Sequence, residues 1–83
     1  MNEGFYHPLE RVSQSSLLVS TASDKIIRLY CPIQAVCILS IHSFYNGDRV
    51  TITAIEEDEQ ARLLYQIDGL PFPYNHFEIL NQT

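Results

Sequence analysis

The sequence predicts a mainly β domain built from short strands, and three observations support this prediction. Residues 49–55 alternate apolar and polar side chains, a period of two that is typical of a strand with one buried face. The pairs Asn46-Gly47 and Asp68-Gly69 are turn signals, because these residue types tolerate positive φ. Short apolar runs recur at roughly ten-residue intervals with turn residues between them, as they do in small barrels and sandwiches.

The clearest pair of strands lies in the second half of the chain. Residues 62–67 alternate in the same way as residues 49–55, and an acidic run at residues 56–59 separates the two segments. We therefore expect the two segments to form a hairpin whose acidic tip is exposed to solvent.

The end of the chain is rich in proline and aromatic residues. Pro71 and Pro73 have no backbone N–H, so the segment around them is expected to form an edge strand or a tight turn. Residues 77–80 are predicted to form the closing strand. Small β domains need aromatic side chains in their cores, and Phe72 and Phe77 are expected to be buried there.

Residues 16–31 allow two interpretations. In one, residues 16–20 and 25–31 are the two strands of a hairpin. In the other, residues 25–30 form a short helix that is ended by Pro32. The short length of the second segment and its β-branched residues favour the hairpin, and the helix remains an alternative.

The remaining N-terminal half is less regular. Residues 33–41 are almost continuously apolar and rich in β-branched side chains, which favours a strand covered on both faces or a bent barrel strand. A helix is the less favoured alternative. Residues 1–16 are polar and mixed, and they are expected to form an arm with at most one helical turn at residues 9–12. We therefore divide the chain into an N-terminal extension, residues 1–25, and a barrel domain, residues 26–83.

Size and charge limit the classes of function. A chain of 83 residues holds a single domain, and its apolar fraction of 46% argues against disorder. Ten acidic against five basic side chains give a net charge of −5, and the basic ones are scattered. Nucleic-acid binding is therefore not favoured, since it draws most of its affinity from cationic contacts with phosphate. A protein partner is expected instead.

The sequence also predicts a compartment. It contains no apolar run of about 18 residues, so no membrane-spanning helix is expected. The N-terminal residues lack the basic start and the apolar stretch of a signal peptide. We expect a cytoplasmic protein in which Cys31 and Cys37 stay reduced.

The residue types that carry catalysis or bind metals are not arranged for either task. Along one extended strand Cys31 and Cys37 are too far apart for a disulfide or a shared metal. His7, His42 and His76 show no paired spacing. The chain also has no glycine-rich phosphate loop and no nucleophile motif. No enzyme activity, cofactor or metal site is predicted.

Two motifs in the second half are similar to parts of a known superfamily. Residues 47–52 read GDRVTI, and residues 72–80 read FPYNHFEIL. The first resembles the strand that opens the core of SH3-like barrels, and the second resembles their closing pattern, a proline-containing 3₁₀ turn that leads into the last strand. The resemblance covers residues 35–80 and implies a small five-stranded barrel, a fold that hosts many unrelated functions.

Two departures separate the chain from peptide-binding SH3 domains. The loop at residues 42–46 is short, and the chain has no tryptophan. Of the usual groove positions Pro73 is matched, while His76 stands where the pattern usually has a tyrosine. The resemblance therefore does not imply a polyproline ligand, which needs an aromatic-lined groove. The loop lengths fit bacterial-type SH3-like barrels, or modules resembling Tudor and KOW domains, better.

The leading hypothesis is a small non-enzymatic protein-interaction or adaptor module. Exposed tyrosines are favoured at protein interfaces, and Tyr45 and Tyr74 are expected to be exposed beside turns. The predicted contact surface consists of Tyr45, Tyr65, Pro73, Tyr74 and His76. One alternative is a nucleic-acid-binding barrel whose rings stack on bases. Another is a homo-oligomeric scaffold joined through the apolar segment at residues 17–29.

Overall fold

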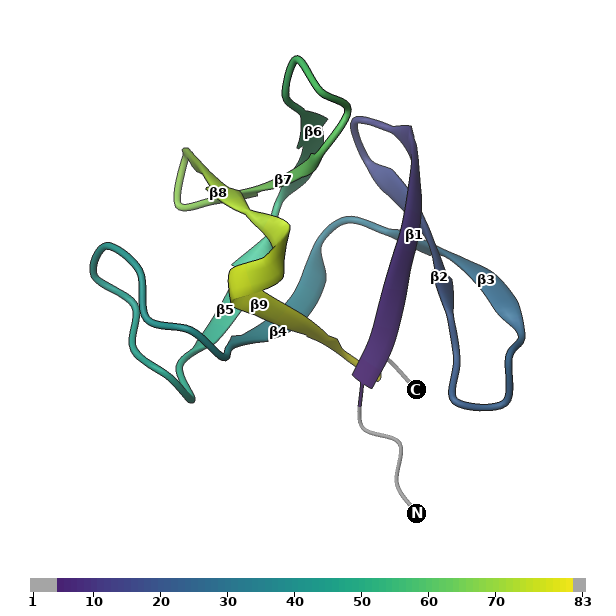
Figure 1. The fold of residues 1–83 in the computed structure, drawn as a ribbon, viewed down its shortest axis with the longest axis horizontal. Coiled ribbons are helices and arrows are strands. Elements are labelled where there is room, and N and C mark those ends of the chain that lie inside the picture. The colour runs from purple at the N-terminus through teal and green to yellow at the C-terminus, as the bar shows by residue number, and fades with distance from the viewer. Residues whose placement is uncertain (1–4, 82–83) are drawn as a thin grey trace.

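The computed structural model describes residues 5–81, and Figure 1 shows their arrangement. In chain order the elements are β1 (Phe5–Ser13), β2 (Ser16–Ser20), β3 (Ile26–Tyr30), β4 (Ile33–Cys37), β5 (Arg49–Ile52), β6 (Ala54–Glu57), β7 (Leu63–Ile67), β8 (Leu70–Pro73), the 3₁₀ turn η1 (Tyr74–His76) and β9 (Phe77–Leu80). The predicted mainly β class is therefore confirmed. Residues 1–4 of the predicted N-terminal extension and residues 82–83 lie outside the described residues.

The strands form two antiparallel sheets. The larger sheet has the order β3-β2-β1-β9-β4-β5, and the smaller one has the order β6-β7-β8. Both contribute to a single hydrophobic core: Ile33 and Ile79 from the larger sheet and Ile55 and Ile67 from the smaller one are almost completely buried. The described strands thus make an open two-sheet arrangement and not a closed barrel.

The N-terminal segment differs from its prediction. Residues 5–13 form strand β1, so the predicted arm with a helical turn at residues 9–12 is wrong. β1 lies between two strands, pairing with β2 on one side and with β9 on the other through Tyr6 and Ile79. Hydrogen-bonding partners on both sides decide the conformation here, because strand formation depends on tertiary pairing more than on composition.

The hairpin interpretation of residues 16–31 is confirmed. β2 and β3 pair residue for residue from Ser16 opposite Tyr30 to Ser20 opposite Ile26, with no bulge. Leu17 and Val19 on β2 face the core and are completely buried. The period of two in this segment is therefore that of a strand with one face covered.

The predicted strand at residues 33–41 is confirmed only as far as Cys37. β4 ends there, and the next two residues leave the sheet. The N–H groups of Ile38 and Leu39 donate to the carbonyl oxygen of His76 at 2.8 and 3.3 Å. The apolar run is therefore divided, because η1 takes the hydrogen bonds that a neighbouring strand would otherwise receive.

The predicted strand at residues 49–55 is divided as well. β5 pairs with β4 in the larger sheet, β6 pairs with β7 in the smaller one, and the N–H of Thr53 between them donates to the carbonyl oxygen of Gln66 at 2.9 Å. The chain therefore passes from one sheet to the other at Thr53. The predicted hairpin is confirmed for β6 and β7, and the predicted edge and closing strands are confirmed as β8 and β9.

The turn between β7 and β8 depends on left-handed backbone. Asp68 and Gly69 have φ angles of 54° and 81°. Two consecutive residues with positive φ are typical of the two-residue turns that match the twist of a hairpin. The Asp68-Gly69 turn signal in the sequence therefore marks two positions where the backbone adopts positive φ.

Replacing Gly69 with alanine is expected to lower the free energy of unfolding by about 1 kcal/mol, because an L side chain costs about 1–2 kcal/mol in the left-handed region. A Cβ at this position meets no atom within 4 Å, so the cost is conformational and not steric. The reverse change, Ala61→Gly, removes the side chain at a φ of 62° and is expected to stabilise slightly. Urea titration measures both, and an unchanged or more stable Gly69→Ala variant would contradict the turn assignment.

An aromatic cluster fills the core between the sheets. The ring of Phe77 lies 6.1 Å from that of Phe44, 6.1 Å from that of Phe72 and 6.5 Å from that of Tyr65. Phe44 and Phe72 meet edge to face at 5.3 Å. The predicted burial of Phe72 and Phe77 is confirmed.

Candidate functional site

Four of the five residues predicted to form a contact surface retain exposed surface. Tyr45 is 68% exposed and Tyr74 is 38% exposed, as expected from their places beside turns. Pro73 is also exposed, and His76 is half-buried. Tyr74, Pro73 and His76 follow one another around η1, whereas Tyr45 belongs to the loop between β4 and β5.

Tyr65 is not part of this surface. Its side chain is completely buried on β7, so its assignment as a contact residue is corrected here. Its hydroxyl group has no hydrogen-bond partner among residues 5–81. Burial raises the pKa of Tyr65 well above its usual value, and the neighbouring Tyr74 adds to the shift. The alternation in the sequence already puts Tyr65 on the same face of β7 as Leu63 and Ile67, and that pattern indicates burial.

Tyr74 lines two hollows. One has a volume of about 300 Å³ and is lined by Asp58, Arg62, Leu63, Leu64, Pro73, Tyr74 and Asn75. The other has a volume of about 200 Å³ and is lined by Pro8, Leu9, Ala61, Arg62, Leu63 and Tyr74. We call the two together the Tyr74 groove. It joins β1, the turn between β6 and β7, and the end of β8.

A network of hydrogen bonds fixes the polar end of the Tyr74 groove. Asp58 accepts from the backbone N–H groups of Gln60 and Arg62 at 2.8 and 2.9 Å, and from Nε of Arg62 at 2.8 Å. The backbone hydrogen bond from Arg62 is the main cause that lowers the pKa of Asp58, and the Arg62 guanidinium lowers it further. Arg62 also donates to Gln60. The guanidinium of Arg62 is therefore held in place at the rim.

His76 makes hydrogen bonds that hold η1 against the loop after β4. Its Nδ1 lies 2.9 Å from the carbonyl oxygen of Leu39, and its own carbonyl oxygen accepts from the N–H groups of Ile38 and Leu39. These bonds fasten η1 to the loop after β4. Tyr45 lines neither hollow of the Tyr74 groove; its N–H donates to Asp48 at the turn before β5.

Sequence reasoning missed the part of the groove that β1 supplies. Pro8 and Leu9 lie more than fifty positions before Leu63 in the sequence, and β1 was not expected to be a strand. A register shift between Pro8 and Glu10 marks this stretch of β1. No local sequence pattern predicts that β1 lies beside Leu63, because this contact depends on the pairing of β1 within the sheet.

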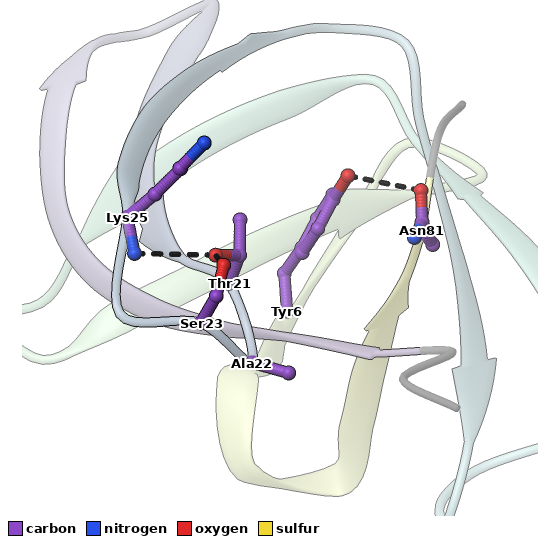
Figure 2. A pocket seen from close by; sticks show the side chains of 6 residues that line it. All are labelled: Tyr6, Thr21, Ala22, Ser23, Lys25 and Asn81. Carbon is purple, nitrogen blue, oxygen red and sulfur yellow. Dashed lines mark hydrogen bonds between the residues drawn. The ribbon is translucent and has the colours of Figure 1, made fainter. Parts of the chain in front are cut away.

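A separate hollow of about 460 Å³ lies at the turn between β2 and β3 and is lined by Tyr6, Thr21, Ala22, Ser23, Lys25 and Asn81. Figure 2 shows the Tyr6 hydroxyl directed toward Asn81, to which it donates at 3.0 Å, and the Lys25 amide facing the Thr21 hydroxyl at 3.2 Å. Thr21 and Ser23 also share a hydrogen bond. These hydroxyl groups make hydrogen bonds within the turn, so the hollow has few polar groups left to bind a ligand.

Residues 5–81 contain no group of three or more His, Cys, Asp or Glu side chains able to hold a metal ion. Both cysteines are free, with Cys37 buried and Cys31 half-buried. In the described part of the chain, no helix has the length and apolar character needed to cross a bilayer. No protein-family model, curated protein or solved structure matches this sequence.

Proposed function

We propose that the chain is a non-enzymatic protein-interaction module that holds an extended segment of a partner protein in the Tyr74 groove. The observation that carries the proposal is the lining of the groove. The lining combines the exposed apolar side chains of Tyr74 and Leu9 with the buried Leu63. Pro73 extends this surface along β8.

The chemistry of this lining suits a peptide segment. Tyrosine and proline supply rigid contact area that loses little conformational entropy on binding, and tyrosine is enriched at interfaces. Arg62, which pairs with Asp58 and lines both hollows, offers a donor for a carbonyl or carboxylate of the partner. The two hollows that Tyr74 lines would take apolar side chains of the bound segment.

We further propose that residues 33–80 are an SH3-like unit. The order of elements supports it: β4 and β5 pair, the chain crosses at Thr53 into the meander β6-β7-β8, and η1 leads into β9, which returns to β4. In this proposal β5 and β6 together correspond to one bent strand of a five-stranded unit. The strands β1, β2 and β3 are then an addition that supplies one wall of the groove.

Replacing Tyr74 with alanine is expected to lower recovery of the partner at least about tenfold, since a central aromatic contact contributes on the order of 1–2 kcal/mol or more. The immobilised chain would be used to recover partners from a native lysate of its source cells, with the recovered proteins measured by quantitative mass spectrometry. Tyr45→Ala is the matched control, because it removes a more exposed tyrosine outside the groove. It should leave recovery unchanged.

Repeating the partner recovery in about 1 M salt distinguishes binding of a protein partner from binding of nucleic acid through its phosphate groups. Apolar contacts persist at that ionic strength, whereas contacts with nucleic acid are lost. Equal recovery of the same proteins by Tyr74→Ala and by the unaltered chain would show that the groove is not the binding surface.

A further inference from the structure

β3 is the terminal strand of the larger sheet, and in Figure 1 no described strand lies beyond it. Hydrogen bonds at its two ends show which residues face β2. The carbonyl oxygen of Lys25 accepts from the N–H of Thr21 at 2.8 Å, and the N–H of Cys31 donates to the carbonyl oxygen of Ser15 at 2.8 Å. Lys25 and Cys31 therefore both direct their backbone groups toward the β2 side.

The free edge of β3 then carries a defined row of backbone groups. Bonded and non-bonded residues alternate along an antiparallel strand, so Ile27 and Leu29 face β2 as Lys25 and Cys31 do. The N–H and C=O groups of Ile26, Arg28 and Tyr30 point the opposite way. No described residue bonds to them along this edge.

The edges of the smaller sheet are covered or blunted, in contrast to β3. β8 contains Pro71 and Pro73, which cannot donate to a further strand. On β6, the N–H of Ile55 donates to the carbonyl oxygen of Gln14, and the carbonyl oxygen of Ile55 accepts from Nε of Arg11. β3 has neither a proline nor a bulge, two of the devices that protect an edge from pairing, and its one charged side chain is Arg28.

The side chains along this edge are apolar and aromatic around one cation. Ile26 is 64% exposed and Tyr30 is 63% exposed, on the same face of the sheet as Arg28. The Arg28 guanidinium lies 5.9 Å from the centre of the Tyr30 ring, and Nη1 lies 3.3 Å from its hydroxyl. Arginine and tyrosine are thus already arranged as a cation–π pair.

We propose that β3 pairs with β3 of a second copy of the chain, antiparallel and about a two-fold axis at Leu29. Such an isologous contact joins the two larger sheets edge to edge. In this register Arg28 lies opposite Tyr30 of the second copy, and each such pair exchanges two backbone hydrogen bonds. Leu29 lies opposite its own equivalent, and Ile27 lies opposite Cys31.

Registers with the axis at Arg28 or at Ile27 also bring these backbone groups into contact, and both are disfavoured. An axis at Arg28 places two guanidinium groups directly opposite each other, which is destabilising. An axis at Ile27 places Arg28 opposite Ile26 and places Tyr30 opposite Asp24, where φ is 63° and the strand has ended. Only the axis at Leu29 gives Arg28 an aromatic partner across the interface.

The proposed contact lies at the end of the apolar segment at residues 17–29 and uses only its exposed edge. Leu17, Val19 and Leu29 are buried within a single chain, whereas Ile26 and Arg28 are exposed on β3. The contact also stands apart from the Tyr74 groove, which no residue of β3 lines. It therefore does not depend on the proposed function.

A single pair of short strands buries little surface, so the dimer is expected to be weak, with a dissociation constant on the order of 10 µM to 1 mM. Sedimentation equilibrium of the full chain over that range should show the dimer. Arg28→Pro removes an edge donor without touching the bonds to β2, and it should weaken the dimer at least about tenfold. Arg28→Lys keeps the donor and the charge and should stay within about threefold.

A monomer throughout that range would overturn the proposal. So would a folded Arg28→Pro variant, checked by circular dichroism, that dimerises as well as the unaltered chain.

A disulfide test fixes the register independently. Residues opposite each other in a non-hydrogen-bonded pair have Cα atoms about 4.5 Å apart, within disulfide range. In Ile27→Cys the new thiol should therefore join the native Cys31 of the second copy when oxidised glutathione accepts the electrons. Adding Cys31→Ser should abolish this cross-link. Cross-linking that survives Cys31→Ser indicates the axis at Ile27 and contradicts the proposed register, as does the absence of a cross-link in Ile27→Cys.

Discussion

Replacing Phe77 with alanine is expected to lower the free energy of unfolding by about 3–5 kcal/mol, which is the range for truncating a buried phenylalanine. Phe77 is buried at the start of β9, and its ring contacts Phe44, Phe72 and Tyr65. It therefore joins residues of both sheets. An 83-residue domain has a total stability of roughly 4–12 kcal/mol, so this one change removes a large part of it.

Urea denaturation followed by circular dichroism measures this loss. Phe77→Leu keeps most of the buried volume and is expected to cost less than half as much, since the residual cavity sets the penalty. Tyr45→Ala truncates an exposed aromatic side chain and should change the stability by less than about 0.5 kcal/mol. A Phe77→Ala variant that unfolds at the same urea concentration as the unaltered chain would refute the position of this ring at the centre of the core.

Stability is expected to fall steeply in alkaline solution because of Tyr65. Burial raises the pKa of this hydroxyl in the folded chain above the value of about 10 that it has when unfolded. The folded state therefore keeps its proton at a pH where the unfolded state has lost it. The contribution is fully present below pH 10 and is lost as the pH rises above it, by up to about 1.4 kcal/mol per pH unit.

Tyr65→Phe tests this cause directly. The variant should show a shallower loss of stability between about pH 10 and pH 12. At neutral pH it should be at least as stable as the unaltered chain, because it removes a buried hydroxyl that has no partner among the described residues. Tyr45→Phe, which removes an exposed hydroxyl, is the matched control. Equal slopes for Tyr65→Phe and the unaltered chain would show that the Tyr65 hydroxyl is not the cause.

Local patterns were sufficient for those parts of the fold that depend on neighbours in the sequence. The turn at Asp68 and Gly69 requires residues that accept positive φ, and these two residue types predicted a turn there. The alternation in β7 predicted a strand, and the prolines of β8 predicted an edge. In each case the cause of the structure lies within a few residues of its effect.

The parts that sequence reasoning missed depend on distant partners. β1 has a mixed composition and becomes a strand because β2 and β9 lie on its two sides. The run after Cys37 is apolar, yet it leaves the sheet because His76 accepts its hydrogen bonds. The misassignment of Tyr65 has a different cause: it shares a face of β7 with Leu63 and Ile67, which indicates burial, but it was assigned to the contact surface because tyrosines are favoured at interfaces.

The position of β1 also bears on how fast the chain can fold. Phe5 pairs with Leu80, and the Tyr6 hydroxyl donates to Asn81 across 75 positions of the sequence. Bringing residues of such separation together costs loop-closure entropy before the strand pairing can offset it. β proteins rich in such contacts fold in milliseconds to seconds. The larger sheet cannot be completed by local hairpins alone, because its middle pair joins opposite ends of the described chain. Until that pair forms, the inner edges of β1 and β9 stay open to other chains.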